Sequence, residues 1–181
     1  MPVASDKNYA KESNLGVSTG FPPVASSDAR ILLLGSMPGQ QSLKAGQYYA
    51  HPQNAFWPIM QSLFGVRGSY TARCRQLAAH RIALWDVLRE TVRPGSLDAD
   101  IRMDTAAAND FQGFLAAHTE IDVIGFNGKK AESLFRRFCL PSLDVRSLRL
   151  VGLPSSSPAY ASISCEDKCV LWQQRLFCQN R

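Results

Sequence analysis

Four short runs of apolar, mostly branched residues recur along this chain, with helical spacing between them. The runs cover 31–34, 82–88, 121–126 and 146–153, and each is typical of a strand buried on both of its faces. Helices are predicted from near Ala55, over 70–80, 109–117 and 130–138, and after Ser164 as an N-cap. Because strands that alternate with helices form parallel sheets covered on both sides, the sequence predicts an α/β fold. We expect a three-layer α/β/α sandwich with a central, mainly parallel four-stranded sheet.

The length of 181 residues suits one domain with a substantial core. Residues 1–27 are rich in Ser, Ala, Pro, Asn and Lys and show no apolar periodicity, which predicts a flexible or loosely docked N-terminal tail. Phe21 to Pro23 are expected to pin the end of this tail against the domain. The single domain is therefore expected to span 28–181.

The charge and the cysteines limit the classes of protein. A net charge of +5 and a pI near 9.1 permit attraction to a polyanion and suit a slightly basic surface equally well. With neither a membrane-length apolar run nor a signal peptide, we expect a soluble, cytoplasmic protein. Five cysteines argue against a disulfide framework. Cys165, Cys169 and Cys178 invite a metal interpretation, but the first two have helical spacing and no compact fourth ligand accompanies them. We therefore expect free thiols, with no metal and no organic cofactor.

Polar or glycine-rich residues lie near or just after the carboxyl end of each predicted strand. They are Gly35 to Gly39, Asp86, Asn127–Gly128 and Ser155 to Pro158. Since ligands of parallel α/β sheets bind beyond the carboxyl ends of the strands, these segments are expected to meet at one edge of the sheet. The first loop lacks both the Gly-Lys-Ser/Thr of a Walker loop and the G-x-G-x-x-G of a dinucleotide fold, so standard nucleotide cofactors are disfavoured.

A short block after the first loop concentrates recognition chemistry. It holds Tyr48-Tyr49-Ala50-His51-Pro52, then Asn54, then Phe56-Trp57 at the start of an amphipathic helix. Together with Gly35-Ser36-Met37-Pro38-Gly39 and Leu153-Pro154-Ser155-Ser156-Ser157-Pro158, this block resembles the uracil-DNA glycosylase superfamily, and most closely its hypoxanthine (deoxyinosine) DNA glycosylase branch. The resemblance extends over roughly residues 21–172, and the motifs occur along the chain in the same order as in the family. One departure concerns the first loop, because mismatch-specific uracil glycosylases carry Gly-x-Asn-Pro-Gly where this chain has Met37.

The resemblance implies a base-binding site. A glycosylase extrudes a nucleotide, stacks its base in a pocket and stabilises a sugar cation and a departing base. Tyr49 resembles the aromatic residue that stacks on the flipped base, with a core or rim tyrosine as the alternative. The backbone of Gly35, Ser36, Met37, Pro38 and Gly39 suits a base carbonyl or an anionic leaving group, although a glycine after a strand is often only a turn.

The polar side chains of the predicted site each have a structural alternative. Asn54 is the predicted catalytic residue because it can hold a water with its oxygen or donate to the base with its nitrogen; its alternative is an N-cap. His51 is predicted to donate to the base or a phosphate, or else is a turn residue satisfied by the backbone. Asp86 is a partner of the base or water, or a cap of a turn. Asn127 is predicted to contact the base, with a turn or N-cap as the alternative.

The serine-rich loop resembles the segment that these enzymes press into the minor groove. Ser155, Ser156, Ser157 and Pro158 suit phosphate contacts, and Tyr160 or Ala159 would fill the vacated space, although a Ser/Pro loop is otherwise a common linker.

Two functions from different classes follow. The first is a monofunctional DNA base-excision repair glycosylase that acts on double-stranded DNA as a monomer. It would prefer hypoxanthine, with uracil or mismatched bases as further substrates. The alternative is a non-catalytic nucleotide- or phosphate-binding α/β module.

Overall fold

The computed structural model describes residues 16–95 and 97–177. Its central sheet consists of β2 (Ile31–Gly35), β3 (Ile82–Asp86), β6 (Val123–Asn127) and β7 (Arg149–Leu153). The strand order is β3-β2-β6-β7 and every pairing is parallel. The four predicted strands and the parallel sheet are confirmed, and the carboxyl ends of the strands share one edge.

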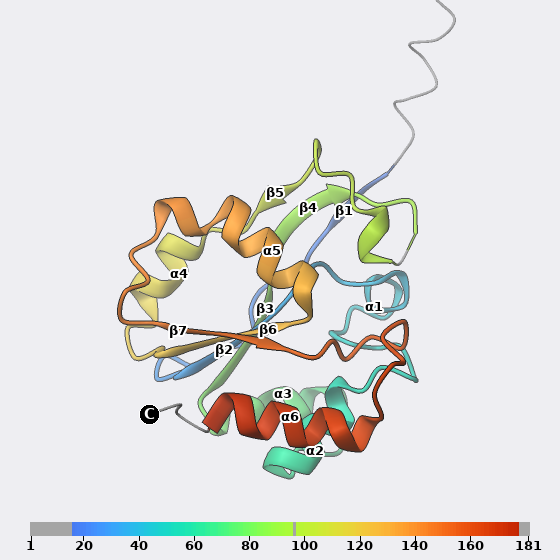
Figure 1. Cartoon of the computed structure of the whole chain (residues 1–181), viewed down its shortest axis with the longest axis vertical. Helices are drawn as coiled ribbons and strands as arrows, with labels where there is room; N and C mark the ends of the chain where they lie inside the picture. The colour runs from blue at the N-terminus through green and yellow to red at the C-terminus, as the bar shows by residue number, and fades with distance from the viewer. Residues whose placement is uncertain (1–15, 96, 178–181) are drawn as a thin grey trace, which may run out of the picture.

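Helices cover both faces of the central sheet, which confirms the three-layer sandwich (Figure 1). One layer holds α4 (Phe111–Ala117) and α5 (Lys129–Phe138). The other holds α2 (Phe56–Phe64), α3 (Tyr70–Ala79) and α6 (Cys165–Phe177). The predicted cap of the last helix is present, because the Ser164 hydroxyl accepts from the backbone N–H of Asp167 at 3.0 Å. A short helix, α1 (Gln40–Ala45), follows the glycine loop and was not predicted.

A second, antiparallel sheet lies beside the first and was also not predicted. Its order is β1-β4-β5, formed by β1 (Val17–Thr19), β4 (Leu88–Val92) and β5 (Ala107–Ala108). Residues 82–88 were expected to form one strand. Instead, β3 ends at Asp86, the chain leaves the central sheet at Val87, and β4 begins at Leu88. Two short 3-10 helices, Asp98–Asp100 and Leu140–Ser142, complete the elements. The first of these turns lies in the connection between β4 and β5.

The predicted N-terminal tail needs a correction over its described part. Residues 1–15 lie outside the described residues. From β1 onward the chain is docked, because Val17–Thr19 pairs with β4. The carbonyl oxygen of Phe21 accepts from the Tyr48 hydroxyl at 3.3 Å and from the Trp85 indole at 3.1 Å, so Phe21 does pin this segment. The domain boundary predicted at residue 28 therefore comes too late.

Trp172 of α6 joins the lower helical layer to the end of the sheet. It is fully buried, and its indole N–H donates to the carbonyl oxygen of Pro154 at 2.9 Å. Its ring meets that of Phe56 edge-on at 6.1 Å between centroids, so α6 supports both α2 and the loop after β7.

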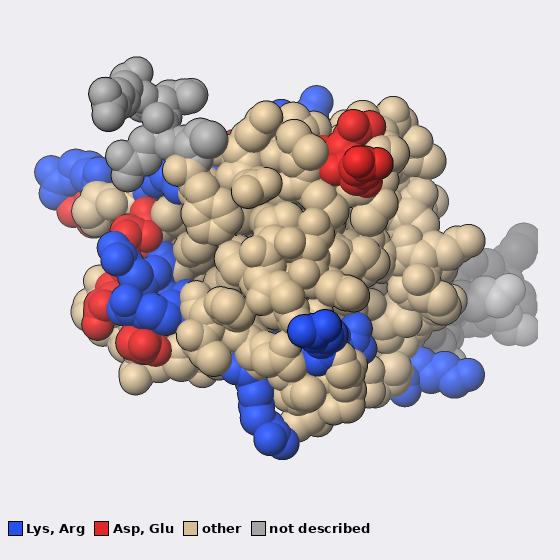
Figure 2. Space-filling view, turned by 90° about the horizontal axis from the view of Figure 1, so that it is seen from below, with Lys and Arg blue, Asp and Glu red and all other residues tan. Residues whose placement is uncertain are grey.

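Charged residues stand in separate groups on the face seen from below (Figure 2). This view does not show one continuous basic surface, so the positive net charge is not gathered there. Among the described residues, no helix is both long and apolar enough to span a bilayer. The four described cysteines, Cys74, Cys139, Cys165 and Cys169, are free thiols, while Cys178 lies outside the described part.

Candidate active site

A cavity of about 550 Å³ opens at the carboxyl edge of the central sheet. Each strand supplies a residue at or just past its end: Gly35 from β2, Asp86 from β3, Asn127 from β6 and Ser155 after β7. Every predicted site residue lines this cavity, namely Gly35, Ser36, Met37, Pro38, Gly39, Tyr49, His51, Asn54, Asn127, Ser155, Ser156, Ser157, Pro158 and Tyr160. The fold thus brings together segments that lie more than a hundred residues apart.

Gly35 permits a close approach at the floor of the cavity. A Cβ atom placed on it would lie 2.3 Å from Oδ1 of Asp86 and 2.9 Å from the hydroxyl oxygen of Tyr49. Real Cβ atoms do not approach other atoms so closely, so any side chain here would displace both groups. Glycine at position 35 is therefore required for the observed arrangement of the floor.

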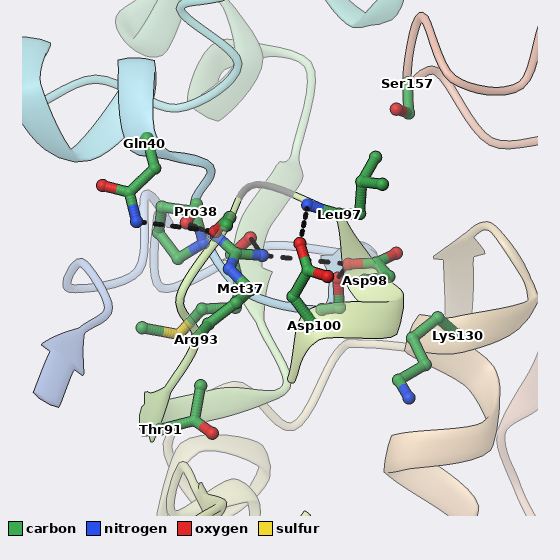
Figure 3. A network of polar contacts seen from close by, with 12 residues as sticks. Met37, Pro38, Gln40, Thr91, Arg93, Leu97, Asp98, Asp100, Lys130 and Ser157 are labelled. Carbon is green, nitrogen blue, oxygen red and sulfur yellow. Dashed lines mark hydrogen bonds and ion pairs between the residues drawn. The ribbon is translucent and has the colours of Figure 1, made fainter. Parts of the chain in front are cut away.

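The carbonyl oxygens of the glycine loop are bound from behind. Those of Gly35 and Ser36 accept from the backbone N–H groups of Val87 (2.9 Å) and Leu88 (3.0 Å). Those of Met37 and Pro38 accept from the Arg93 guanidinium, as the sticks of Figure 3 show. Since these oxygens face β4 and Arg93, they do not oppose an electronegative ligand atom in the cavity.

Arg93 is a site residue that the sequence analysis missed. Its side chain is 1% exposed, and its guanidinium lies 3.9 Å from the Asp98 carboxylate, which also accepts from the Ser36 hydroxyl. Burial lowers the pKa of Arg93, and the nearby charges of Asp98 and Asp86 act in the opposite direction. The sequence signal available was an arginine directly before Pro94 and Gly95, just after the residues that form β4.

Tyr48 and Tyr49, the two tyrosines of the segment 48–57, lie in different environments. Tyr48 is buried, and its hydroxyl donates to the carbonyl oxygens of Phe21 and Pro22. Tyr49 adopts a left-handed backbone conformation with a φ of 54°, and its ring stacks on Phe56 at 4.0 Å with 19° between the planes. The Tyr49 hydroxyl is buried with no hydrogen-bond partner among the described residues. Burial, together with the negative charge of Asp86, raises its pKa.

Asn54 and His51 both make local hydrogen bonds at the wall of the cavity. Oδ1 of Asn54 accepts from the backbone N–H of Phe56 at 2.9 Å, so this side chain satisfies a donor at the start of α2 from the position before the N-cap, which is Ala55 rather than Asn54. Nδ1 of His51 accepts from the backbone N–H of Gln53 at 3.1 Å. A neutral imidazole that accepts at Nδ1 carries its proton on Nε2, which leaves a donor on the other side of the ring.

Ser156 ties three segments of the site together. Its backbone N–H donates to Oδ1 of Asn127 at 2.7 Å, and its hydroxyl accepts from Nδ2 of the same residue at 2.8 Å. Its carbonyl oxygen accepts from the backbone N–H of Ala55 at 2.9 Å. With 1% exposure, Ser156 is buried, unlike its neighbours in the loop. Asn127 and Ser156 thus fix the serine-rich loop to β6 and to the start of α2.

Asp86 is a buried carboxyl group whose Oδ2 atom has no hydrogen-bond partner among the described residues. It is 3% exposed and lines the cavity, and no described group lies within hydrogen-bond distance of its buried Oδ2. Burial and the nearby Asp98 charge raise the pKa of Asp86 to about 7, against the influence of Arg93. The turn cap suggested from the sequence is not formed, because no turn N–H donates to this side chain.

Comparison with known proteins identifies the family. Residues 22–174 match the family model described as the uracil DNA glycosylase superfamily. The chain belongs to the uracil-DNA glycosylase superfamily. It is accordingly a DNA glycosylase, a hydrolase of DNA repair, as the resemblance implied.

Two curated relatives and one solved structure are similar to it. The hypoxanthine DNA glycosylases of Methanosarcina barkeri and Methanosarcina acetivorans are each 36% identical, over 115 and 118 residues. These matches cover 62% and 64% of this chain and 72% and 73% of the relatives. A solution NMR structure from M. acetivorans, described provisionally as a uracil DNA glycosylase, has a TM-score of 0.70 and 30% identity. The match covers 89% of this chain and 99% of that one.

The buried carboxyl of this glycosylase site predicts a pH dependence of stability. Because the pKa of Asp86 is raised from 3.8 to about 7 on folding, the folded state binds the proton more tightly than the unfolded state. Stability from this group is fully present below about pH 4 and is lost as the pH rises through 7. A pKa change of one corresponds to about 1.4 kcal/mol. The free energy of unfolding of the wild type should therefore fall relative to that of Asp86→Asn across this range.

Urea denaturation of both proteins at a series of pH values measures this difference. Parallel stability curves for the two proteins would contradict the prediction.

Proposed function

We propose that this glycosylase removes hypoxanthine from deoxyinosine in double-stranded DNA, by flipping the nucleotide and hydrolysing its N-glycosidic bond. One observation carries the proposal: the glycine loop, the 48–57 block and the serine-rich loop line a single cavity. The names of the two Methanosarcina relatives support hypoxanthine as the substrate. No lysine lies in a recognisable nucleophile motif, so the proposed enzyme is monofunctional and releases the base and an abasic site.

In this proposal the flipped base enters the cavity and stacks on Tyr49. One face of the Tyr49 ring is covered by Phe56, so the opposite face is the one available to a base. Stacking of a base on an aromatic side chain contributes about 1–3 kcal/mol. The glycine loop, whose carbonyl oxygens are bound by β4 and Arg93, offers backbone N–H groups to the base edge.

Asn54 and His51 are proposed to act at the bond that breaks. Oδ1 of Asn54 holds the Phe56 N–H through one lone pair, which leaves its second lone pair and the Nδ2 group for a water molecule or the base. The Nε2–H of His51 is available for a base carbonyl or a phosphate. Asn127 supports this site by fixing the serine-rich loop.

The serine-rich loop is proposed to hold the DNA backbone. Ser157 and Pro158 lie beside the exposed Tyr160, which is 42% accessible at the rim of the cavity and suits the role of the residue that fills the vacated duplex space. The backbone carbonyl of Tyr160 accepts from Lys168 at 2.7 Å, so the loop is anchored to α6. Since Ser156 is buried, its part in this proposal is to hold the loop rather than to touch phosphate.

The substrate is tested with duplex oligonucleotides that carry inosine, uracil, xanthine or a G·T mismatch. Each is incubated with the wild-type protein and then treated with alkali, which cleaves the strand at abasic sites. We expect cleavage at inosine to be fastest. Binding of these duplexes or of free nucleotides without any cleavage would instead support a non-catalytic binding module.

Replacing Asn54 separates its catalytic role from its capping role. Asn54→Ala removes both the carboxamide and the cap, whereas Asn54→Ser keeps an oxygen that can cap the helix. Both variants should release hypoxanthine about 10²-fold more slowly in single-turnover assays, as expected for loss of a positioned polar group in the transition state.

Thermal melting is measured beside activity for the two Asn54 variants. Only Asn54→Ala should lose stability. Full activity in Asn54→Ser would show that the cap is the whole contribution of this residue.

The serine-rich loop is tested by comparing paired and unpaired inosine. Its contacts act before the chemical step, by making extrusion of the nucleotide favourable. Ser157→Ala and Tyr160→Gly should therefore slow base release from duplex inosine, and the loss should shrink on single-stranded inosine. Single-turnover rates are measured at matched salt, because phosphate contacts make binding depend on salt.

Ser147→Ala is the control, since Ser147 is exposed just before β7, at the opposite edge of the sheet. Equal losses on both substrates would assign the loop to the chemical step, and no loss on either would remove it from the site.

A further inference from the structure

The proposed roles leave one buried titratable group of the cavity unused. Asp86 ends β3 directly opposite Gly35, and its carboxyl group occupies the space where a side chain at position 35 would stand. It is 3% exposed, and within the part of the chain that the structure describes its buried Oδ2 has no hydrogen-bond partner. A buried carboxyl group without donors costs free energy, so its retention in a ligand cavity points to a use for it.

The depth of Asp86 in the cavity indicates which part of a bound nucleotide it would contact. Leu97 and Tyr160, which line the same cavity, are 55% and 42% exposed and mark the rim, whereas Asp86 and Arg93 are nearly inaccessible and mark the floor. A nucleotide that enters from duplex DNA leaves its sugar and phosphates at the rim and carries its base toward the floor. Asp86 therefore faces the base rather than the attacking water.

The surroundings of Asp86 favour the neutral carboxylic acid. The charged and titratable groups near it are Tyr48 and Tyr49 of the 48–57 block, Arg93 after β4, and Asp98. Among the described residues, Arg93 makes its ion pair with Asp98, and no ion pair joins it to Asp86. The Asp98 charge and burial both favour the protonated form, in agreement with a raised pKa of about 7.

A purine leaving group is helped by a general acid, whereas uracil can leave without one. Uracil can depart as an anion that its two carbonyl groups stabilise, whereas a purine departs through N9 of an imidazole ring whose other nitrogen, N7, is basic. Protonation of N7 makes the purine a neutral leaving group. An acid at the floor of the cavity therefore suits a purine substrate, and a neutral carboxyl can supply the proton near neutral pH.

We propose that Asp86 is a catalytic residue, the general acid that protonates N7 of hypoxanthine as the bond between C1′ and N9 breaks. This inference rests on the proposed function. The carboxyl proton passes to N7, and the electrons of the C1′–N9 bond pass to the purine ring. Water adds to C1′ and loses a proton, which returns through solvent to the Asp86 carboxylate. The sum is hydrolysis to hypoxanthine and an abasic site, with no other reactant.

The test is a cycle of one substitution and one altered substrate. Asp86→Asn keeps the shape of the side chain and removes the transferable proton. The substrates are duplexes with deoxyinosine or with 7-deaza-2′-deoxyinosine, in which carbon replaces N7. Single-turnover base release is measured from pH 5 to pH 9, with Asp144→Asn as the matched control because Asp144 is exposed and pairs only locally with Arg146.

On deoxyinosine, Asp86→Asn should be slower than the wild type by about 10²-fold or more, as expected for loss of a general acid. On 7-deaza-2′-deoxyinosine, the wild type and Asp86→Asn should differ by less than about threefold, because a cycle of two changes that remove one interaction is not additive. The wild-type rate should fall as the pH rises above the pKa of Asp86, and this fall should be absent in Asp86→Asn.

Several outcomes would overturn the proposal. The first is a rate for Asp86→Asn on deoxyinosine equal to that of the wild type. The second is a loss from Asp86→Asn on the 7-deaza substrate as large as its loss on deoxyinosine. The third is a wild-type rate that rises with pH, which would indicate an ionised Asp86 that accepts a hydrogen bond from the base. Thermal melting of Asp86→Asn shows whether the variant is folded. If it is not, the pH profile of the wild type and its rate on the 7-deaza substrate still test the acid role. If the wild type releases no hypoxanthine at all, the proposed function fails first; if it does and Asp86→Asn matches it, only the acid role fails.

Discussion

The floor of the active site depends on the close contact between β2 and β3 at their carboxyl ends. Gly35 pairs in register with Asp86, and the missing side chain of the glycine leaves room for a carboxyl group and for the Tyr49 hydroxyl. These two polar groups meet where the apolar sheet ends. The cavity is therefore a consequence of strand register as much as of the loops that surround it.

The segment that leads from the central sheet into β4 holds the glycine loop. The backbone N–H groups of Val87 and of Leu88, the first residue of β4, bind the carbonyl oxygens of Gly35 and Ser36. Arg93 follows at the end of the same strand and binds the next two carbonyl oxygens of the loop. A loop that lacks the Asn of the mismatch-specific enzymes at Met37 is thus held in place by backbone and guanidinium donors. Its polar chemistry is left to residues from other segments.

Ser156 and Asn127 hold the opposite wall of the cavity in place. Their paired hydrogen bonds join β6 to the serine-rich loop, and the Ser156 carbonyl reaches the start of α2 beside Asn54. The family match over residues 22–174 includes all of these segments. The geometry adds that two of the predicted contact residues, Asn127 and Ser156, form two hydrogen bonds with each other.

The sequence by itself determined the sandwich, its four parallel strands and the set of segments at the carboxyl edge. Apolar runs and helical spacing are local signals, and parallel strands must end at the same edge. Only the tertiary structure decided that Val17–Thr19 joins a second sheet, that Arg93 reaches the glycine loop and that no described residue binds Oδ2 of Asp86. Short polar strands carry no apolar pattern, and the burial of one carboxyl or guanidinium depends on which distant residues surround it. That information exists only once the chain has folded.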